Sequence, residues 1–234
     1  MSLIILCASH LKTEQNAEQM REMLDSQMSQ TKVCDVYVSY TGLSLEFDDS
    51  RVHLIKQPEE QLAQFQHYKR LVRTLCDTCI LHSENYAIFT DDDDIMAPER
   101  NAEYLRLIRD RIDVVRIDKS VVRFSLDQRV SSLQEALKRS VCDKLHEYVD
   151  LCLRGDVLLR FVDEVDGENY ISDCVFNMIV QRYIIDNPAK CIEIETNKPL
   201  YYYRYSMFRG VRHKYLKEAN KLPRNGVKDV EINI

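Results

Sequence analysis

The sequence predicts a single α/β domain with an open, mainly parallel sheet and helices on both faces. The chain has 234 residues, which fits one domain with a large core, or two at most. Hydrophobic residues make up 45% of it and glycine and proline contribute five residues each, so it is globular rather than disordered. Short β-rich runs alternate with amphipathic segments along the first half, which is typical of a parallel sheet.

The first half is expected to contain four strands and two long helices. The expected strands are residues 3–9, 34–40, 51–57 and 85–90. An amphipathic helix separates the first two strands and begins after Thr13, a cap-forming residue type. A second long helix follows Pro58, and its apolar stripe runs from Leu62 to Cys79. The fourth strand leads directly into four consecutive aspartates.

The second half alternates less regularly. The expected elements are a helix at 98–110, a strand pair at 113–117 and 121–125, a mostly helical stretch at 131–153, a helix at 172–185, and strands at 191–196 and 200–205. We find no internal repeat and no linker, so a single domain should cover residues 1–220. The polar residues 221–234 are expected to form a tail.

Net charge and cysteine spacing exclude several classes of protein. A net charge of −6 argues against nucleic-acid binding, which needs a basic surface. Of the eight cysteines, Cys76 and Cys79 have paired spacing, but a zinc ribbon needs a second pair. Both fall on the apolar stripe of the second long helix, so packing in the core is favoured. Reduced cysteines are the expectation.

The N-terminal apolar stretch is too short for a signal sequence and lacks a basic start. No stretch approaches the roughly 20 apolar residues that span a bilayer. We therefore expect a soluble, cytoplasmic protein without a membrane span.

The run "FTDDDDIMAP" places Asp91, Asp92, Asp93 and Asp94 at the end of the fourth strand. Ligands of open α/β sheets bind beyond the carboxyl ends of the strands. If the chain stays extended, Asp91 and Asp93 project to one side and Asp92 and Asp94 to the other. Two carboxylates at such a position suit a hard divalent cation, Mn²⁺ or Mg²⁺, whose open positions phosphate oxygens can fill.

Other interpretations of the acidic run fit less well. A calcium-binding EF-hand loop needs glycine at its sixth position and glutamate at its twelfth, and counting from Asp91 gives Met96 and Ala102. A phosphatase of the aspartyl-phosphate type carries its aspartates after the first strand, not the fourth. A solvated acidic loop stays open as an alternative, although apolar residues flank the run on both sides.

The segment "NYAIFTDDDDIMAPERNAEYL" resembles the strand–DxD–helix segment of GT-A-fold glycosyltransferases. It is especially similar to family-2-type enzymes and to their relatives in large DNA viruses. By element order, the resemblance extends over residues 1–110. It implies a Rossmann-like GT-A domain with a nucleotide-sugar-binding half (1–110) and an acceptor-binding half (111–220). After the second strand, where many relatives carry an acidic turn, this chain has "VSYTG".

The resemblance also implies an activity and roles for the aspartates. It implies an enzyme that binds a nucleoside diphosphate sugar, usually a UDP-sugar, through a divalent metal. By position, Asp93 would be the metal ligand, and Asp91 would share the metal or reach the ribose. Asp92 or Asp94 would steady the loop or touch the sugar.

Further donor-side residues follow from the same resemblance. Ser9 and His10, at the end of the first strand, would lie on the nucleoside side. In relatives a cationic residue of the helix before the acidic strand approaches the diphosphate, and His67 and Lys69 occupy that helix here. A lysine that simply extends to solvent is an alternative explanation for Lys69.

The resemblance further implies a general base near the start of a helix in the second half. Asp173 is our candidate, and Asp166 and Glu168 are its rivals in the same loop. Helix capping is the alternative role for Asp173, since aspartate is common at that position.

The aromatic and basic segment "YYYRYSMFRGVRHKY" supplies the last candidates. It fits a segment that closes over a diphosphate, with Arg212 binding the phosphates. His213 is a candidate further metal ligand, as a C-terminal histidine is in several relatives.

The sequence thus favours a metal-dependent glycosyltransferase that moves a sugar to a hydroxyl of a glycan or other acceptor, with inversion. Two alternatives stay open. One is a metal-dependent nucleotidyltransferase or phosphohydrolase, and the other is a non-catalytic sugar-nucleotide-binding module.

Overall fold

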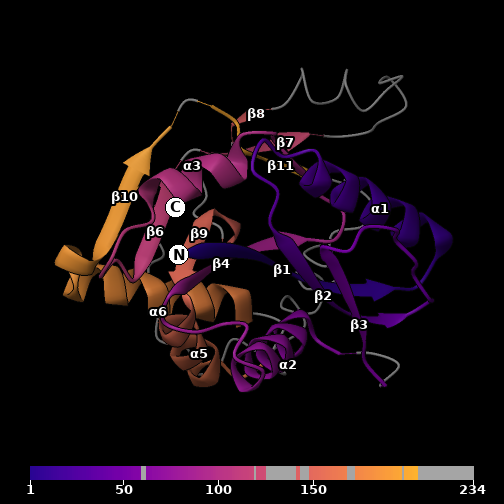
Figure 1. Cartoon of the computed structure of the whole chain (residues 1–234), viewed down its shortest axis with the longest axis horizontal. Helices are drawn as coiled ribbons and strands as arrows, with labels where there is room; N and C mark the ends of the chain where they lie inside the picture. Colours follow the sequence, from indigo (N-terminus) through magenta and orange to yellow (C-terminus); the bar gives the residue numbers. More distant parts are fainter. Residues whose placement is uncertain are drawn as a thin grey trace, which may run out of the picture.

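The computed structural model describes residues 1–58, 62–118, 120–124, 141–142, 148–167, 172–196 and 198–204 (Figure 1). These residues form an α/β domain with a seven-stranded central sheet and a second sheet of four strands. The predicted fold class, a mainly parallel mixed sheet flanked by helices, is confirmed.

The central sheet has the strand order β10-β6-β9-β4-β1-β2-β3. Its strands are β1 (Ser2–Leu11), β2 (Asp35–Gly42), β3 (Val52–Lys56), β4 (Asn85–Asp91), β6 (Val114–Asp118), β9 (Leu151–Arg154) and β10 (Cys191–Glu195). Strands β1 to β4 are parallel to one another, and β6 is parallel to β10. Strand β9 lies between β4 and β6 and is antiparallel to both.

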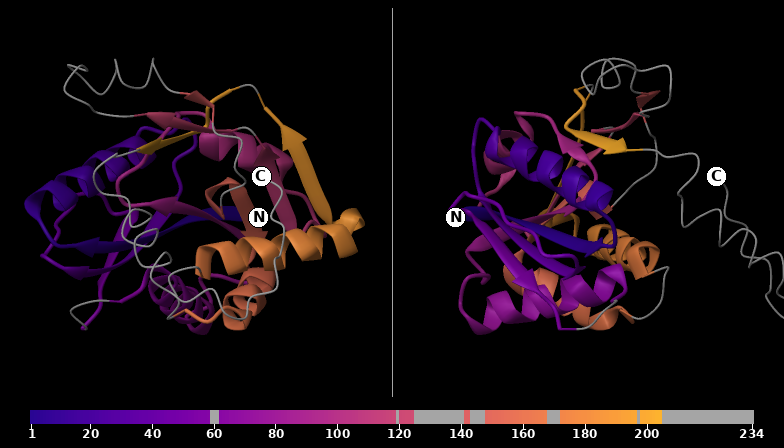
Figure 2. Two further views of the ribbon diagram at one scale, coloured as in Figure 1. Left: turned by 180° about the vertical axis from the view of Figure 1, so that it is seen from behind. Right: turned by 90° about the vertical axis from the view of Figure 1, so that its right-hand side faces the viewer.

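Helices cover both faces of the central sheet (Figures 1 and 2). On one side lie α1 (Glu14–Met28) and α3 (Arg100–Leu107), and on the other lie α2 (Gln64–Asp77), α5 (Gly155–Glu164) and α6 (Ser172–Asp186). Because both faces are covered, the middle strand β1 is apolar almost without interruption. Helix α1 begins as predicted, since the Thr13 hydroxyl accepts a hydrogen bond from the Asn16 backbone N–H at 3.2 Å.

The second sheet has the order β5-β11-β7-β8 and lies on the side of α1 and α3 (Figure 1). Its strands are β5 (Ile95–Met96), β11 (Tyr201–Arg204), β7 (Val121–Phe124) and β8 (Val141–Cys142). Strand β11 is antiparallel to β5 and parallel to β7. Since β5 directly follows the four aspartates, this sheet fixes the end of the acidic run.

Two expectations for the second half were wrong. Residues 113–117 and 121–125 were expected to pair, but β6 belongs to the central sheet and β7 to the second one. The stretch 131–153 was expected to be mostly helical, yet its described part holds β8, the 3₁₀ helix η1 (Tyr148–Asp150) and β9. The short run "LCL" has no period that separates strand from helix, and pairing with β4 and β6 makes it a strand.

Helix α5 was not anticipated, and the expected tail 221–234 lies outside the described residues. The expectation of two buried cysteines on α2 was half right. Cys76 is half-buried, whereas α2 ends at Asp77, so Cys79 follows the helix with a φ of 57° and is exposed. Seven of the eight cysteines are free thiols in the part of the chain whose side chains the structure describes: Cys7, Cys34, Cys76, Cys79, Cys152, Cys174 and Cys191.

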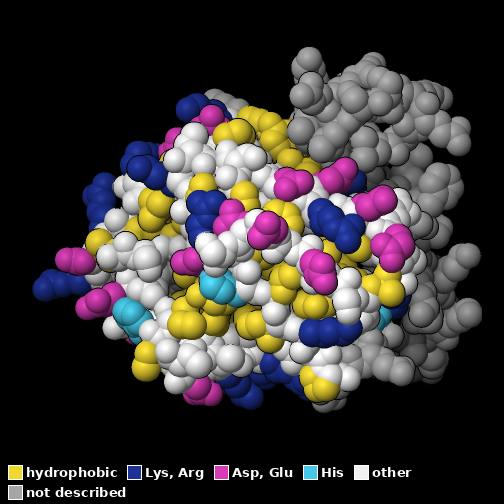
Figure 3. Space-filling view, turned by 45° about the vertical axis from the view of Figure 1, so that its right-hand side comes forward, with side chains coloured by type: hydrophobic (Ala, Val, Ile, Leu, Met, Phe, Trp, Pro, Cys, Tyr) yellow, Lys and Arg dark blue, Asp and Glu magenta, His cyan; other side chains and the backbone are white. Residues whose placement is uncertain are grey.

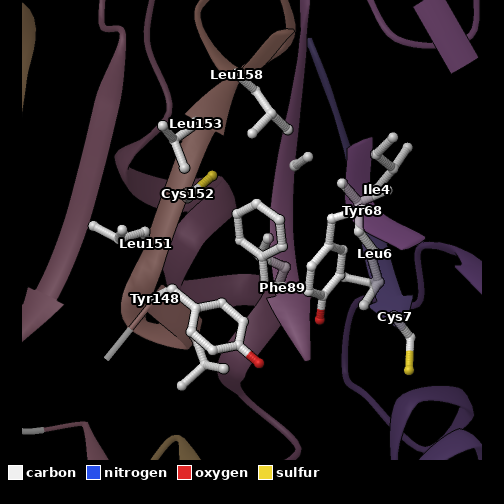
Figure 4. Packing of buried hydrophobic residues seen from close by; sticks show 14 of the residues in the cluster. Ile4, Leu6, Cys7, Tyr68, Phe89, Tyr148, Leu151, Cys152, Leu153 and Leu158 are labelled. Atoms are coloured by element: carbon white, nitrogen blue, oxygen red, sulfur yellow. The ribbon is translucent and has the colours of Figure 1, made fainter. Parts of the chain in front are cut away.

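An aromatic cluster joins four elements beneath the carboxyl end of β4. The Phe89 ring of β4 contacts Tyr68 of α2, Tyr148 of η1 and Phe176 of α6, with centroid distances of 4.9, 5.7 and 5.4 Å. These contacts are edge-to-face, the favourable arrangement for aromatic rings. Figure 4 shows Tyr68 and Tyr148 on either side of Phe89. The cluster therefore fixes α2, η1 and α6 relative to the end of β4.

On the face shown in Figure 3, the lysine and arginine side chains of the described residues lie among aspartate and glutamate side chains. None of the described helices is both long enough and apolar enough to cross a membrane.

Candidate functional site

The candidate site lies at the carboxyl edge of the central sheet, where β1, β2 and β4 end side by side. In the sheet register Ala8 is opposite Asp91, and His10 is opposite Thr41. Strand β2 ends at Gly42, whose φ of 91° and close approach to the Leu11 carbonyl exclude a larger side chain. The topology thus brings Ser9, at the end of β1, beside the acidic run.

The predicted alternation of the four aspartates was wrong beyond Asp91. Strand β4 ends at Asp91, and Asp92 and Asp93 form a turn. The turn sends Asp92 toward β1 and Asp94 toward the second sheet, so these two do not share a side. A strand continued through four like charges would leave Asp94 without the donors that it finds on β11.

Asp94 is fully buried and anchored to β11. Its Oδ2 accepts a hydrogen bond from the Tyr201 hydroxyl at 2.6 Å, and its Oδ1 accepts one from the Arg204 backbone N–H at 2.6 Å. Burial, and then the charges of Asp93 and Asp91, raise the pKa of Asp94 well above its usual range. Both oxygens are engaged inside the protein, so Asp94 steadies the loop.

Asp92 contacts the end of β1. The Ser9 hydroxyl donates a hydrogen bond of 2.5 Å to its Oδ2. Burial, followed by the charge of Asp93, raises the pKa of Asp92 to about 7, while the bond from Ser9 acts in the opposite direction. The structure therefore brings together Ser9 and Asp92, two residues that the sequence analysis named separately.

Asp93 has the least engaged carboxylate of the four. Among the described residues, no other side chain donates a hydrogen bond to it. Arg204 donates from its Nε to the Asp93 backbone carbonyl at 2.6 Å and from its Nη2 to Glu22 at 2.5 Å. Burial raises the pKa of Asp93, and the charge of Arg204 lowers it. Arg204 thus offsets part of the negative charge without occupying the carboxylate.

Asp91 is held by two residues that the sequence analysis missed. Its Oδ1 accepts hydrogen bonds from the Tyr148 hydroxyl and from the Gln64 amide at 2.6 Å. The Gln64 amide also donates to the Tyr148 hydroxyl at 2.8 Å. The Asp91 backbone N–H donates to the Tyr201 hydroxyl at 2.9 Å. Neither Tyr148 nor Gln64 belongs to a motif, so only the tertiary structure identifies them.

Three other candidate residues, His10, His67 and Lys69, form hydrogen bonds inside the protein. His10 shares a hydrogen bond with the Thr41 hydroxyl, and partial burial and then Lys12 lower its pKa. His67 is buried, with its Nδ1 2.9 Å from the Ser39 hydroxyl.

Lys69 donates from its Nζ to the carbonyl of Val165 at 2.6 Å. This bond ties α2 to the loop between α5 and α6. Among the described residues, Lys69 makes no hydrogen bond to the acidic run.

The candidate base Asp173 is half-buried in the first turn of α6. One turn later, Phe176 packs against Phe89 of β4 and Phe65 of α2. Helix α6 therefore begins near the carboxyl end of β4, close to the acidic run. The hydroxyl of Ser172 donates to the backbone carbonyl of Asp166, which ties Asp166 to the start of α6. Glu168, Arg212 and His213 lie outside the described residues.

The carboxylates at this site fit a hard cation only if a bound substrate supplies further oxygen ligands. In the part of the chain that the structure describes, no three His, Cys, Asp or Glu side chains are grouped to hold a metal. Mg²⁺ and similar ions are commonly held by one or two carboxylates and substrate phosphates, with water filling other positions. Asp93 offers one such carboxylate.

Comparison with known proteins gives the fold. No family model and no curated protein sequence matches the chain. Among solved structures, residues 1–349 of Staphylococcus aureus TarS match with a TM-score of 0.57 and 13% identity, over 87% of this chain and 60% of that one. Another S. aureus TarS structure matches with a TM-score of 0.55 and 14% identity, over 88% and 37%. A 4-diphosphocytidyl-2C-methyl-D-erythritol synthase matches at 0.50 and 9%, over 93% and 98%.

At these identities the matches establish the fold alone. The chain has a Rossmann-like fold of the GT-A type. It spans about 60% of the length of TarS 1–349.

Proposed function

We propose that this protein is a GT-A glycosyltransferase that moves a sugar from a nucleoside diphosphate sugar, a UDP-sugar in our expectation, to an acceptor hydroxyl. The observation that carries the proposal is the position of Asp93. Its carboxylate is not engaged by other described side chains and lies at the carboxyl edge of the sheet, where ligands of such folds bind. The similarity of the protein's fold to that of TarS is consistent with the proposal.

Each acidic residue has a distinct part in this proposal. Asp93 would hold Mn²⁺ or Mg²⁺, with Asp91 beside it. When bound, the cation supplies Lewis-acid neutralisation of the departing diphosphate. Ser9 and Asp92 would lie on the nucleoside side, where their mutual hydrogen bond fixes them. Arg212 and His213 are retained as candidate phosphate and metal ligands.

Asp173 would act as the general base. Its carboxylate would take the proton from the acceptor hydroxyl as the oxygen attacks the sugar, which gives direct displacement with inversion. Asp173 lies in the first turn of α6, where the helix dipole attracts negative charge, and this position suits the role. The packing of Phe176 against Phe89 supports this role, because it keeps the start of α6 near the acidic run.

A thermal-shift screen tests the metal and nucleotide site. UDP, CDP and GDP are added with Mn²⁺, Mg²⁺ or EDTA to the wild type, to Asp93→Ala and to Asp110→Ala. Asp110 is an exposed aspartate before β6, so Asp110→Ala is the matched change in charge away from the site. We expect a cation-dependent rise in Tm with one nucleotide for the wild type and for Asp110→Ala. A ligand at about 100 times its Kd adds about 2.7 kcal/mol of stability. The proposed site is misplaced if Asp93→Ala retains the full shift.

Nucleotidyl transfer is a second candidate activity for this protein. It is favoured by the similar fold of the 4-diphosphocytidyl-2C-methyl-D-erythritol synthase, which matches over 98% of its own length. Product analysis separates the two reactions. A glycosyltransferase releases UDP and a glycosylated acceptor, whereas a nucleotidyltransferase releases pyrophosphate. Pyrophosphate as the product would overturn the proposed activity even if the Mn²⁺ screen succeeds.

A further inference from the structure

We infer that Tyr148 and Gln64 are positioning residues for Asp91, which hold its carboxylate in the orientation that binds the nucleotide sugar. This inference rests on the proposed function. It adds two residues, from η1 and from the first turn of α2, to a site otherwise built from the ends of β1 and β4 and from the acidic turn.

The Tyr148 hydroxyl has a fixed position. Its side chain is buried, and its ring packs against Tyr68 and Phe89 with centroid distances of 6.0 and 5.7 Å. In Figure 4 the ring lies at the border of the aromatic cluster, and its hydroxyl points out of that cluster. A donor on a rigid ring fixes the direction of the hydrogen bond that the Asp91 Oδ1 accepts.

Gln64 completes the arrangement beside Tyr148. It is the first residue of α2, is exposed, and donates from one amide nitrogen to both Asp91 and Tyr148. Two donors on the same carboxylate oxygen, with the Asp91 N–H held by Tyr201, restrict rotation of the Asp91 side chain. The direction of its second oxygen is thereby set as well.

The buried Tyr148 hydroxyl needs a partner, but the cost of burial does not explain why Asp91 and Gln64 form these bonds. Asp91 is only half-buried and Gln64 is exposed, so water can satisfy both groups. Asp94, which is fully buried, needs its protein donors to be stable, and Asp91 does not. What Tyr148 and Gln64 add to a carboxylate that is already accessible to water is a defined orientation.

The test compares three variants in titrations of UDP, and of CDP and GDP alongside, in the presence of Mn²⁺. Tyr148→Phe keeps the ring and removes the donor. Gln64→Met keeps the length of an exposed side chain and removes the amide. Tyr86→Phe is the matched control, because the hydroxyl of this buried tyrosine donates to the Arg109 and Ile112 carbonyls at the opposite end of β4.

We expect Tyr148→Phe to weaken nucleotide binding about tenfold, the scale of one lost hydrogen bond to a charged group. Gln64→Met should weaken it about threefold, because Tyr148 still donates to Asp91. In donor turnover these losses should appear as a higher KM at unchanged kcat, since ground-state binding is what changes. Tyr86→Phe should lower Tm and leave the affinity at the wild-type value.

Wild-type affinity in both Tyr148→Phe and Gln64→Met overturns the inference and leaves the proposed function standing. Gln64 is exposed, so its variant gives an answer even if Tyr148→Phe does not fold. An equal loss of affinity in Tyr86→Phe also overturns the inference, because the effect would then follow stability alone. A wild-type protein that binds none of the three nucleotides overturns the proposed function, and the inference with it.

Discussion

The four aspartates divide their charge among different surroundings. Asp94 is buried against β11, Asp92 is hydrogen-bonded to Ser9, and Asp91 is held by the Tyr148 hydroxyl. Asp93 lies beside Arg204 of β11, whose charge lowers its pKa against the effect of burial. Because burial and mutual repulsion raise the pKa of Asp92 and Asp94, the cluster binds protons more tightly when folded than when unfolded.

This gives a pH dependence of stability through Asp92. Its folded pKa of about 7 exceeds the usual value of 3.8, so its contribution is fully present below the usual value and is lost as pH rises through about 7. We expect the free energy of unfolding in EDTA to fall between pH 5 and pH 8. The asparagine in the variant Asp92→Asn cannot ionise. Between pH 5 and pH 8 the free energy of unfolding of this variant should therefore fall by roughly 2–4 kcal/mol less than that of the wild type. Urea unfolding at the two pH values measures this.

The control for this experiment is Asp110→Asn, at an exposed site before β6, which should follow the wild type at both pH values. Parallel pH curves for Asp92→Asn and the wild type would contradict the assignment of the effect to Asp92.

At the residue scale, the sequence located the acidic run but not the surroundings of each carboxylate. The end of an apolar strand predicted where the aspartates lie, and the end of β1 suggested Ser9. The donors to Asp94 lie 107 and 110 residues further along the chain, beyond the reach of any local pattern. The role of Tyr148 could not be predicted for the same reason, because its partner Asp91 is far away in the sequence. Its own stretch was expected to be helical from its apolar spacing.

Strand β11 is the element that fixes the acidic loop. The Tyr201 hydroxyl donates to Asp94 and accepts from the Asp91 N–H, so one side chain bridges both ends of the turn. The buried Arg100 guanidinium lies 4.9 Å from the centroid of the same ring. The sequence predicted a strand at 200–205, but its pairing with β5 and β7 depends on a second sheet that no periodicity indicated.

Tyr201→Phe tests the bridge, because it keeps the ring and its contact with Arg100. The change leaves the buried Asp94 carboxylate with one donor fewer, so we expect a loss of about 1–3 kcal/mol in the free energy of unfolding. Tyr202→Phe, on the next residue of the strand, is the matched control and should change stability by less than about 0.5 kcal/mol. Equal losses in the two variants would show that the bridge is not the cause.

At the scale of the whole molecule, the aromatic cluster connects the two halves of the chain. Phe89 and Tyr68 belong to the first half, and Tyr148 and Phe176 to the second. The alternation of strands and helices predicted the fold class correctly. It did not predict that β9 enters the sheet antiparallel between β4 and β6, because this arrangement depends on pairing partners far apart in the sequence.

Phe176→Ala tests how strongly α6 is attached to the sheet. Removing a buried ring from the contacts with Phe89 and Phe65 should cost about 3–5 kcal/mol of stability. Met178→Ala, on the same helix at a residue 72% exposed, should change stability by less than about 0.5 kcal/mol. Urea unfolding measures both. A small effect of Phe176→Ala would mean that α6 is held by other contacts.

The position of β9 also sets an order for folding during synthesis on the ribosome. Strands β1 to β4 complete their part of the sheet once residue 91 has emerged, but β6 has to wait for β9, residues 151–154. Until then the nascent chain carries an unpaired edge on β4, the kind of edge that invites pairing with other chains. The donors of Asp94 emerge later still, at Tyr201 and Arg204. The acidic loop is thus among the first parts of the protein to be made and among the last to reach its final form.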